Sequence, residues 1–344
     1  MKTINNFIKS LIPAGLMIVV LAIMACSTSD STINTSDSTI NTSDSTIKTS
    51  DSTIKTSDDL DIAAKGYTNS DRIVSVSWLN KHMNDKNLKI IDVRSLTEGL
   101  PEKYNGGHIA GAINIPAGST FQQEINGIKG MLPSAAHIEN ILSENGIKPT
   151  DTIIFYDDNK SLWASRALWG MDVYGHKDSK LLDGDIKLWI AKGYAVSLET
   201  PLITKSSYKF SGTPNTNLIA DLETVQGSIE GKAEVLDTRS PDEYSGKNLR
   251  GNARGGHIPG SVLIEWKQNV SEDGSFLPAK DLKDLYVSAN IDSGDEVYTL
   301  CQTAVRATHS WFVLSELLGY PDVSVYDGSA IEWANREDTA LEVR

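Results

Sequence analysis

The feature that most restricts the fold of this 344-residue chain is an internal duplication, in which four short motifs recur in the same order. The two copies are offset by about 145 residues, whereas the units of solenoid proteins are only about 20–45 residues long. A repeat of this length corresponds to a complete domain, and a chain of this size is expected to hold about two domains. The first copy carries the motifs at Asp92-Val93-Arg94, Gly107-His108-Ile109, Leu132-Pro133 and Leu182-Asp183-Gly184. The second copy carries them at Asp237-Thr238-Arg239, Gly256-His257-Ile258, Leu277-Pro278 and Tyr326-Asp327-Gly328.

Within each copy, short apolar runs alternate with segments of helical spacing. In the second copy, buried strands are predicted at Val235–Asp237, Val297–Leu300 and Val323–Val325, and helices at Leu282–Ala289 and Ala307–Leu318. Strands that alternate with helices favour an α/β fold with a mainly parallel sheet flanked by helices on both faces. We therefore predict two such domains, at residues 69–200 and 201–344. The Ser-, Thr-, Lys- and Pro-rich segment Leu198–Thr216 is the predicted linker between them.

The chain begins with the pattern of an export signal. Two lysines precede an apolar run from Leu11 to Ala25, which is shorter than the roughly 20 residues of a membrane span but fits the core of a signal peptide. The run ends in Ile-Met-Ala-Cys, which resembles a bacterial lipobox, so residues 1–25 are predicted to be a lipoprotein signal peptide and Cys26 the lipidated residue. An uncleaved N-terminal anchor is the alternative. Both interpretations predict an exported protein held at a membrane on the periplasmic side, and Ser27 favours the outer membrane if the host has one.

Residues 26–68 are predicted to form a flexible tether. Their repeated unit, Ser-Thr-Ile-(Asn or Lys)-Thr-Ser-Asp, is seven residues long, which is also the period of a coiled coil. Each unit has a single strongly apolar residue, however, whereas a coiled-coil seam needs two in every heptad. Ser, Thr and Asp are also unfavourable inside helices. A solvated tether that holds the folded domains away from the membrane is therefore the better interpretation.

The charge and the cysteine content narrow the chemistry. A formal net charge of −13 argues against a nucleic-acid partner, because neutralising phosphates needs clustered Lys and Arg. It also requires that an anionic substrate be held by local groups. The chain has only two cysteines, Cys26 and Cys301, so a disulfide framework is impossible, and its six histidines show no zinc-site spacing. We expect no metal, and contact with a membrane through the lipid anchor only.

Cys301 lies where a predicted strand passes into a predicted helix, in the segment Cys-Gln-Thr-Ala-Val-Arg. Ligands of α/β proteins collect at the carboxyl ends of the strands, and a short loop before a helix can turn its backbone N–H groups toward an anion. This position and the cation of Arg306 would stabilise a thiolate, which is the nucleophilic form of cysteine. A buried, inert cysteine is the alternative. The predicted site consists of catalytic Cys301 and the substrate-binding loop residues Gln302, Thr303, Ala304, Val305 and Arg306.

This loop resembles the active-site loop of rhodaneses, which has the form Cys-x-x-x-x-Arg/Thr. The Asp-x-Arg strand end, the Gly-His-Ile-Pro-Gly turn and the Asp-Gly-Ser-x-x-x-Trp segment that ends at Trp333 resemble the same family, over about residues 70–340. The duplicated set is similar to the tandem-domain thiosulfate and 3-mercaptopyruvate sulfurtransferases, in which only the second domain carries the cysteine. In agreement, Asp157 stands in the first copy where Cys301 stands in the second.

The resemblance implies a ping-pong reaction, in which the Cys301 thiolate takes a sulfane sulfur from a small anionic donor and passes it on. Thiosulfate is the expected donor, cyanide or a thiol is the expected acceptor, and no cofactor is needed. The alternatives are 3-mercaptopyruvate as donor, or a persulfide carrier that turns over poorly by itself. Phosphatases of related fold use Cys-x5-Arg, one residue longer than the Cys-x4-Arg of this chain, which argues against phosphate chemistry.

Two arginines outside the loop are further candidates for substrate binding. Arg239 ends a strand, and it either binds substrate or pairs with Asp237 to hold the loop, since the same pair recurs in the first copy. Arg254 lies in a basic stretch that the first copy lacks, and it either attracts anions or is ordinary surface charge. His309, in the helix after Cys301, is expected to be a surface side chain rather than a general acid or base.

Overall fold

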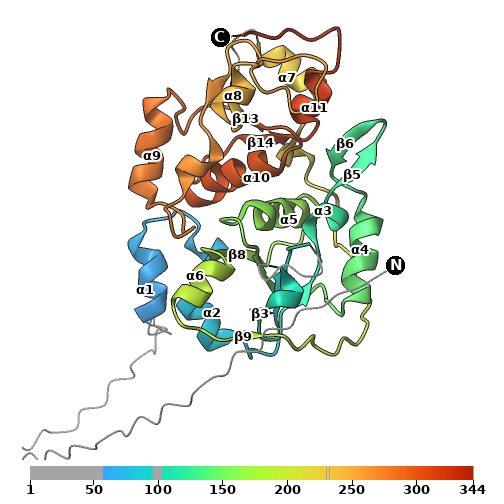
Figure 1. The fold of residues 1–344 in the computed structure, drawn as a ribbon, viewed down its shortest axis with the longest axis vertical. Helices are drawn as coiled ribbons and strands as arrows, with labels where there is room; N and C mark the ends of the chain where they lie inside the picture. Colours follow the sequence, from blue (N-terminus) through green and yellow to red (C-terminus); the bar gives the residue numbers. More distant parts are fainter. Residues whose placement is uncertain (1–56, 96–102, 230, 232, 344) are drawn as a thin grey trace, which may run out of the picture. The chain divides into compact units, whose positions relative to one another are not determined.

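The structure is a computed structural model that describes residues 57–95, 103–229, 231 and 233–343. The predicted signal peptide, Cys26 and the tether up to residue 56 lie outside these residues, so lipidation and export stay predictions. In the described part of the chain, no helix is long and apolar enough to cross a membrane. The described residues build two α/β domains, each on its own five-stranded sheet (Figure 1).

The first domain is built on a parallel sheet with the strand order β1-β8-β7-β2-β4. Its strands are β1 (Ile73–Ser75), β2 (Leu88–Asp92), β4 (Ile113–Asn114), β7 (Thr152–Tyr156) and β8 (Ser179–Asp183). Its helices are α2 (Val76–His82), α3 (Ala117–Thr120), α4 (Ala135–Glu144), α5 (Leu162–Val173) and α6 (Ile186–Ala191), with the 3-10 turns η1 (Ser70–Arg72) and η2 (Tyr104–Gly106). Two antiparallel pairs complete it, namely β3 (His108–Ile109) with β9 (Val196–Ser197), and the hairpin of β5 (Gln123–Ile125) with β6 (Ile128–Met131).

The second domain has a parallel sheet with the strand order β10-β14-β13-β11-β12. Its strands are β10 (Ile219–Ala220), β11 (Glu234–Asp237), β12 (Val262–Leu263), β13 (Val297–Leu300) and β14 (Val323–Tyr326). Its helices are α7 (Leu222–Ser228), α8 (Pro241–Tyr244), α9 (Ala279–Ser288), α10 (Val305–Trp311) and α11 (Ser329–Trp333), with the short helices η3 (Thr216–Leu218), η4 (Trp266–Asn269) and the π-helical η5 (Phe312–Leu317). The strand order equals that of the first sheet position by position, as a duplicated domain requires.

The alternation of side chains along the central strands explains why both faces of each sheet are covered. In β7, Ile153 and Phe155 pack on one face while Ile154 and Tyr156 pack on the other, and all four are buried. Helices α4 and α5 cover the first of these faces, and α2 and α6 cover the second. The second sheet has α9 and α10 on one face and α7 and α11 on the other. The predicted α/β fold with helices on both faces is confirmed.

The secondary structure predicted for the second copy differs from the observed elements mainly at their ends. The strand predicted at Val297–Leu300 is β13, with the same bounds. The helix predicted at Ala307–Leu318 begins two residues earlier, as α10, and continues with π-helical geometry in η5. Such π-helical turns are rare insertions into α-helices. A periodicity argument assumes 3.6 residues per turn throughout the helix and does not anticipate them.

The predicted tether reaches too far along the chain, because residues 57–68 belong to the folded part. Helix α1 (Ser57–Ala64) is followed by Tyr67, and the side chains of Ile62 and Tyr67 are both buried. Both residues follow shortly after the low-complexity repeat, which ends at Asp58, and the sequence interpretation counted them with it. The predicted linker also packs on the first domain, since Tyr208 is 1 % exposed and its hydroxyl group lies 2.8 Å from Nδ1 of His176.

The two domains share an apolar core through α5 and α10, which lie side by side (Figure 1). One cluster of buried side chains runs from Phe155 in the first sheet, through both helices, to Val325 in the second sheet. Nearly every residue of both helices is buried, which is expected of helices enclosed by protein on all sides. The loops that precede α5 and α10 therefore meet the opposite domain.

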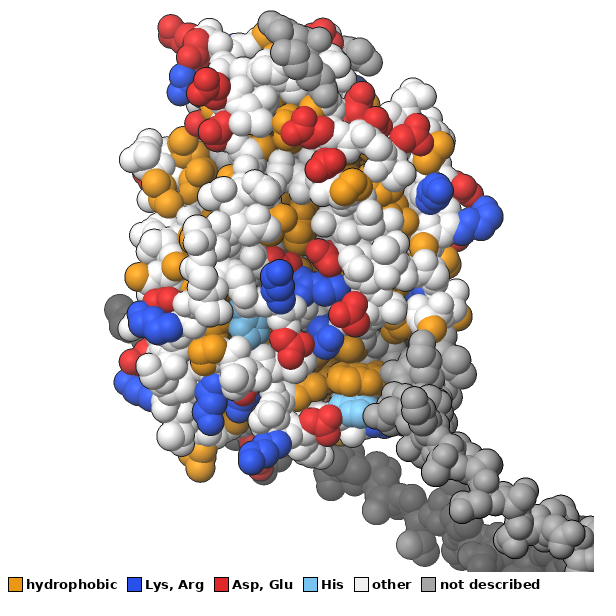
Figure 2. Space-filling view, turned by 180° about the vertical axis from the view of Figure 1, so that it is seen from behind, with side chains coloured by type: hydrophobic (Ala, Val, Ile, Leu, Met, Phe, Trp, Pro, Cys, Tyr) orange, Lys and Arg blue, Asp and Glu red, His pale blue; other side chains and the backbone are white. Residues whose placement is uncertain are grey.

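Charge is dispersed over the surface. On the face drawn in Figure 2, Lys and Arg side chains occur in small groups among Asp and Glu, and the described residues of that face form no continuous basic surface. Together with the net charge of −13, this distribution means that an anionic substrate must be held by groups at its own site rather than by the field of the whole protein.

Candidate active site

Cys301 is the first residue after β13, the central strand of the second sheet. The residue is 1 % exposed, so its thiol is nearly enclosed. The following residues to Ala304 lead into α10. The thiol therefore lies at the carboxyl end of the sheet and before a helix, where the sequence predicted it and where α/β proteins bind ligands.

Ser329, the first residue of α11, holds the Cys301 loop in shape. Its hydroxyl oxygen accepts hydrogen bonds from the backbone N–H of Cys301, at 3.3 Å, and from that of Ala304, at 3.1 Å. The same hydroxyl group donates to the carbonyl oxygen of Tyr326 at 2.8 Å. The backbone N–H of Ala330 adds a bond to the Cys301 carbonyl oxygen at 2.9 Å.

Two residues of this arrangement have left-handed backbone conformations. The φ angle is 59° at Ala304 and 52° at Ser329. A residue with a Cβ atom is strained in this region by about 1–2 kcal/mol. The loop therefore keeps its shape because the hydrogen bonds to Ser329 offset the strain.

Arg306 closes the loop and forms a bidentate ion pair with Glu243, with nitrogen–oxygen distances of 2.6 and 2.8 Å. Burial raises the pKa of Glu243, but the hydrogen bonds and charge of Arg306 outweigh it and lower that pKa to about 2. Burial lowers the pKa of Arg306, whereas its hydrogen bonds to Glu243 and the interaction with Cys301 raise that pKa above its ordinary value. Arg306 is therefore a permanent cation, near enough to Cys301 for the two groups to interact electrostatically.

The remaining loop residues contact distant parts of the chain. The side-chain amides of Gln302 and Asn252 exchange two hydrogen bonds, at 2.8 and 3.0 Å. The carbonyl oxygen of Thr303 accepts a hydrogen bond from Nε2 of Gln122 in the first domain, at 2.9 Å. Val305 packs in a small apolar cluster with side chains of both domains. These contacts fix the shape of the loop, and the role of its residues in substrate binding stays a prediction.

Sequence reasoning missed Glu243 and Ser329. Glu243 follows Ser240 in a Ser-x-x-Glu pattern, which forms a capping box at the start of α8. That pattern predicts the beginning of a helix, but it does not identify Arg306 as the partner of the carboxylate. Ser329 follows the recurrent Asp-Gly motif, and nothing in the sequence indicates that its hydroxyl group faces the Cys301 loop.

The first domain has the corresponding loop without a thiol. Asp157 is the first residue after β7, the central strand of the first sheet. Its buried carboxylate accepts hydrogen bonds from four backbone N–H groups, those of Asn159 (2.8 Å), Ser161 (3.0 Å), Trp163 (2.7 Å) and Ala164 (3.2 Å). Burial raises the pKa of Asp157 to about 6, although these hydrogen bonds act to lower it. The loop of this fold can therefore surround an anion, and in the first domain that anion is its own carboxylate.

Known proteins share this duplicated arrangement. The family of the rhodanese-like domain matches residues 75–192 and 221–336. The chain belongs to the rhodanese family. Together with the relatives described next, this membership supports sulfur transfer as its general function.

Rhodanese relatives cover nearly all of the described chain. The thiosulfate sulfurtransferase of Corynebacterium glutamicum is 33% identical over 282 residues, which are 79% of this chain and 91% of that protein. The sulfur carrier protein TtuD of Thermus thermophilus is 32% identical over 280 residues, which are 78% of this chain and 96% of that protein. The structure of the anaerobic ergothioneine biosynthesis enzyme from Chlorobium limicola, in complex with trimethyl histidine, shares the fold. Its TM-score is 0.72 at 20% identity, over 80% of this chain and 71% of that one.

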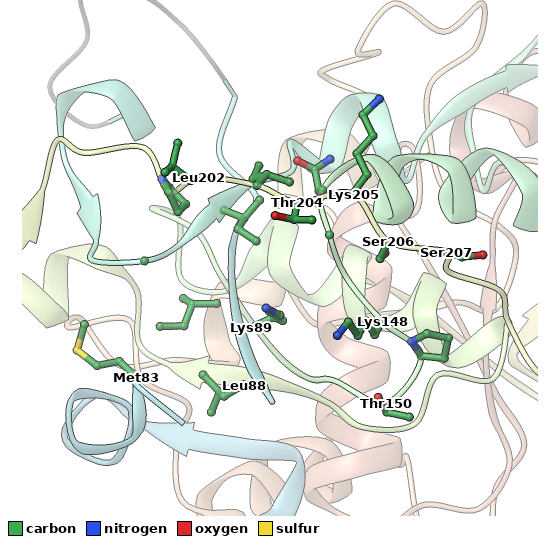
Figure 3. A pocket seen from close by; sticks show the side chains of 18 residues that line it. Met83, Leu88, Lys89, Lys148, Thr150, Leu202, Thr204, Lys205, Ser206 and Ser207 are labelled. Atoms are coloured by element: carbon green, nitrogen blue, oxygen red, sulfur yellow. The ribbon is translucent and has the colours of Figure 1, made fainter. Parts of the chain in front are cut away.

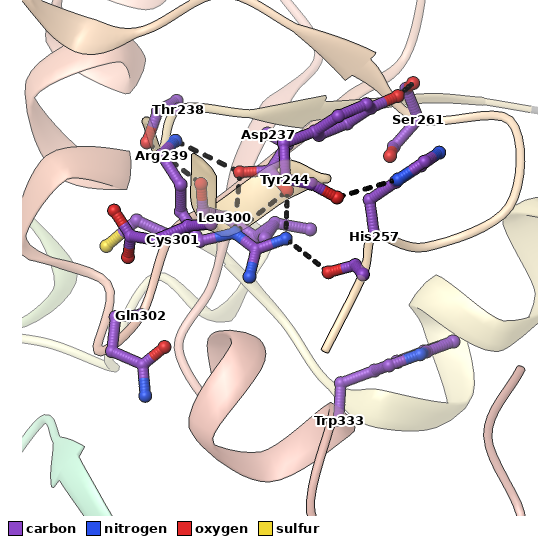
Figure 4. Close-up of polar contacts among 12 residues, drawn as sticks. Asp237, Thr238, Arg239, Tyr244, His257, Ser261, Leu300, Cys301, Gln302 and Trp333 are labelled. Carbon is purple, nitrogen blue, oxygen red and sulfur yellow. Dashed lines mark hydrogen bonds and ion pairs between the residues drawn. The ribbon is translucent and has the colours of Figure 1, made fainter. Parts of the chain in front are cut away.

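In the second rhodanese domain, the guanidinium group of Arg239 faces Asp237 and the carbonyl oxygen of Gly256 (Figure 4). These nitrogen–oxygen distances are 2.6 and 2.9 Å, and Arg239 is 4 % exposed. Arg94 makes the equivalent contacts to Asp92 and to the Gly107 carbonyl in the first domain. The contacts agree with the alternative in which the pair holds the loop, and a role of Arg239 in substrate binding stays a prediction.

Arg254 contacts the C-terminal segment of the second rhodanese domain. Its guanidinium group donates to the carbonyl oxygen and the hydroxyl group of Thr339, at 2.8 and 2.6 Å, and to the carbonyl oxygen of Trp333 at 3.1 Å. These bonds secure the chain after α11. The proposed attraction of anions by Arg254 stays a prediction.

The expected surface position of His309 is wrong, because its side chain is fully buried in α10. Its ring stacks on Phe276, and Nε2 donates to the carbonyl oxygen of Lys160 at 3.2 Å. Burial lowers the pKa of His309 to about 3, so the ring stays neutral at physiological pH. One face of α10 packs on its own sheet and the opposite face packs on the other rhodanese domain. The sequence of the second domain alone does not indicate that the opposite face is buried.

Within the described ranges, no group of three or more His, Cys, Asp or Glu side chains could hold a metal ion. A hollow of about 770 Å³ lies in the first rhodanese domain, beside β2 and the linker, and its walls include Lys89, Lys148 and Lys205 (Figure 3). None of the residues that line it belongs to the Cys301 loop. The hollow is therefore separate from the candidate active site.

Proposed function

We propose that this rhodanese is a thiosulfate sulfurtransferase that carries the transferred sulfur as a persulfide on Cys301. The observation that carries the proposal is the interaction of Cys301, the one thiol in the described part of the chain, with the permanent cation of Arg306. The corresponding loop around Asp157 supports the proposal in its geometry, because four of its backbone N–H groups are directed at the first side chain of the loop.

In the first half-reaction, the Cys301 thiolate attacks the outer sulfur of thiosulfate. The sulfur–sulfur bond of the donor breaks, its electron pair leaves with sulfite, and a persulfide forms on Cys301. In the second half-reaction, cyanide or a thiolate attacks the terminal sulfur and the Cys301 thiolate leaves. The electrons balance without an external oxidant or reductant, and the displacement is divided into two steps of covalent catalysis. Arg306 and the backbone N–H groups of the loop would offset the negative charge of both forms.

The length of the loop supports sulfur chemistry over phosphate chemistry, and the name of one relative supports the choice of donor. The segment from Cys301 to Arg306 is one residue shorter than the loop of the related phosphatases, and a smaller loop suits a sulfur atom better than a phosphate group. The relative from Corynebacterium glutamicum is named a thiosulfate sulfurtransferase. With 3-mercaptopyruvate as donor the same persulfide would form on Cys301. The identity of the donor is therefore a separate question from the residue that holds the sulfur.

A second candidate function is that of a sulfur carrier, in which Cys301 passes its sulfur to a partner protein. It is favoured by the relative from Thermus thermophilus, which is named a sulfur carrier protein and has a comparable identity. A carrier would hold the persulfide stably and release it slowly to small acceptors.

The test is the intact mass of the full chain after mixing with thiosulfate, with Cys301→Ser as the control. We expect the wild-type chain to gain one sulfur atom, which cyanide then removes, and the variant to gain none. A gain only with 3-mercaptopyruvate would change the donor. A gain that cyanide does not remove would favour the carrier, and no gain with either donor would refute the persulfide mechanism.

A further inference from the structure

The turn Asp327-Gly328-Ser329 connects the active-site loop to the opposite rhodanese domain. Asp327 accepts a hydrogen bond from Nη1 of Arg166 at 2.7 Å and another from the backbone N–H of Leu132 at 2.7 Å. Both donors belong to the first domain. The side chains of Arg166 and Asp327 are only 0 % and 4 % exposed, and a buried ion pair of this kind fixes geometry because either charge alone is unfavourable in the core.

Arg166 is held in one orientation by contacts within the first domain. Its Nε donates to the carbonyl oxygen of Phe121 at 3.1 Å, and its Nη2 donates to that of Gly130 at 2.9 Å. Its guanidinium carbon lies 4.7 Å from the centre of the Trp169 ring. One fully buried guanidinium group therefore joins α5, the ends of the β5–β6 hairpin and the turn at Asp327.

The turn at Asp327 is connected to the Cys301 loop through Ser329, so the position of the turn affects the position of the loop. Ser329 lies two residues after Asp327, and its hydroxyl oxygen accepts the backbone N–H groups of Cys301 and Ala304. Because Ala304 and Ser329 both have left-handed φ angles, the loop would relax if the turn moved. Relaxation would change the directions of the backbone N–H groups of the loop, among them those of Cys301 and Ala304.

The hairpin of the first domain makes a second, independent contact with the loop. Gln122 donates from Nε2 to the Thr303 carbonyl oxygen at 2.9 Å. A Cβ atom at Gly130 would lie only 2.7 Å from the Cβ atom of Thr303. The hairpin backbone thus approaches the loop as closely as a glycine permits.

We propose that Arg166, Asp327 and Ser329 form a positioning relay, through which the first domain sets the geometry and reactivity of the Cys301 loop in the second. The relay deepens the proposed function and rests on it for the reaction that the loop serves. Its three members are positioning residues, since they act on the sulfur through the backbone of the loop. The first domain, which has no thiol in its own loop, takes part in the chemistry of the second in this way.

The duplication provides a matched control for the relay. Asp183 occupies in the first domain the place of Asp327, and it accepts the backbone N–H of Phe276 across the interface at 2.8 Å. Its side chain is 6% exposed and pairs with Lys65. The turn that follows it faces the Asp157 loop, where Asp185 accepts the backbone N–H of Lys160 at 3.2 Å. Asp183→Asn therefore removes a buried charge between the domains without touching the Cys301 loop.

The experiment measures how fast iodoacetamide alkylates Cys301 as a function of pH, by mass spectrometry of the Cys301 peptide from the full chain. We expect Asp327→Asn and Arg166→Met each to slow alkylation at neutral pH about tenfold, because the thiolate is the reactive form and a displaced loop would stabilise it less. The double variant should be no slower than the slower single variant, because coupled residues are not additive. Asp183→Asn should stay within about twofold of the wild type.

Equal slowing by Asp327→Asn and Asp183→Asn would overturn the relay, since general loosening of the interface would then explain both. If Asp327→Asn does not fold, as judged by thermal unfolding, Ser329→Ala breaks the relay at its other end without removing a buried charge. Wild-type alkylation in Ser329→Ala would also overturn it. Alkylation requires no sulfur donor, so a wild-type chain that is alkylated normally but forms no persulfide refutes the proposed function and not the relay.

Discussion

The Cys301 loop and the Asp157 loop leave the central strands of two sheets with the same topology, yet they differ in what they hold. The Asp157 loop is closed on its own carboxylate. The Cys301 loop is instead held by the hydroxyl group of Ser329, which lies outside the loop. The first side chain of this loop, the Cys301 thiol, therefore lies near the cation of Arg306. The second residue of the following helix is Trp163 in the first domain and Arg306 in the second. The fold provides a loop that can surround an anion, and we propose that the thiol and the arginine make that loop reactive in the second domain.

Exchanging the first residues of the two loops tests this comparison most strongly. Cys301→Asp should abolish sulfur transfer, because the loop would then hold its own carboxylate as the Asp157 loop does. Asp157→Cys in that background should restore none of it, because Trp163 stands in the first domain where Arg306 stands in the second. Rates with thiosulfate and cyanide measure both effects, and activity in the double variant would show that the surrounding residues matter less than we propose.

Replacing the cation should have the next largest effect. Arg306→Met should lower the rate of persulfide formation about 100-fold, which is typical when one preorganised group that stabilises charge is lost. Rapid mixing with thiosulfate, quenching at set times and intact-mass measurement give the rate of persulfide formation. Arg94→Met is the matched control, since it removes a buried arginine from the first domain and should leave the rate of the folded protein within about twofold.

The buried carboxylate of Asp157 should make stability depend on pH. Its folded-state pKa is raised by burial from 3.8 to about 6, so the folded state binds the proton more tightly than the unfolded state does. The stability that this proton contributes is present below pH 4 and is lost as pH rises through about 6, by up to about 3 kcal/mol. Urea unfolding of the wild type and Asp157→Asn between pH 4 and 7.5 measures the difference, and a difference that does not vary with pH would contradict it.

The smallest predicted effect concerns backbone strain in the two loops. Ala304→Gly should stabilise the protein by about 1 kcal/mol, because glycine accepts the φ angle of 59° without strain. Ser161 has a φ angle of 62° in the first domain, but its hydroxyl group donates to the carbonyl oxygens of Leu182 and Gly184. Ser161→Gly should therefore destabilise the protein, and thermal unfolding of both variants distinguishes the two loops.

The sequence predicted the fold and the position of the Cys301 loop because both depend on local patterns. Alternating apolar runs indicated the sheets, and the strand–loop–helix order placed Cys301 and Arg306 together. The partners that hold the loop could not be predicted, since Glu243, Ser329 and Gln122 come from distant parts of the chain. His309 was misplaced for the same reason, because its surroundings are supplied by the other domain.

The shared core around α5 and α10 has a consequence for the history of this chain. A helix that is buried on nearly all sides loses half of its cover if either domain is removed, and the exposed apolar surface would favour aggregation. We therefore expect the thiol-free half to be required for folding of the other half, so that it would be retained after the gene duplication even though its own loop has no thiol.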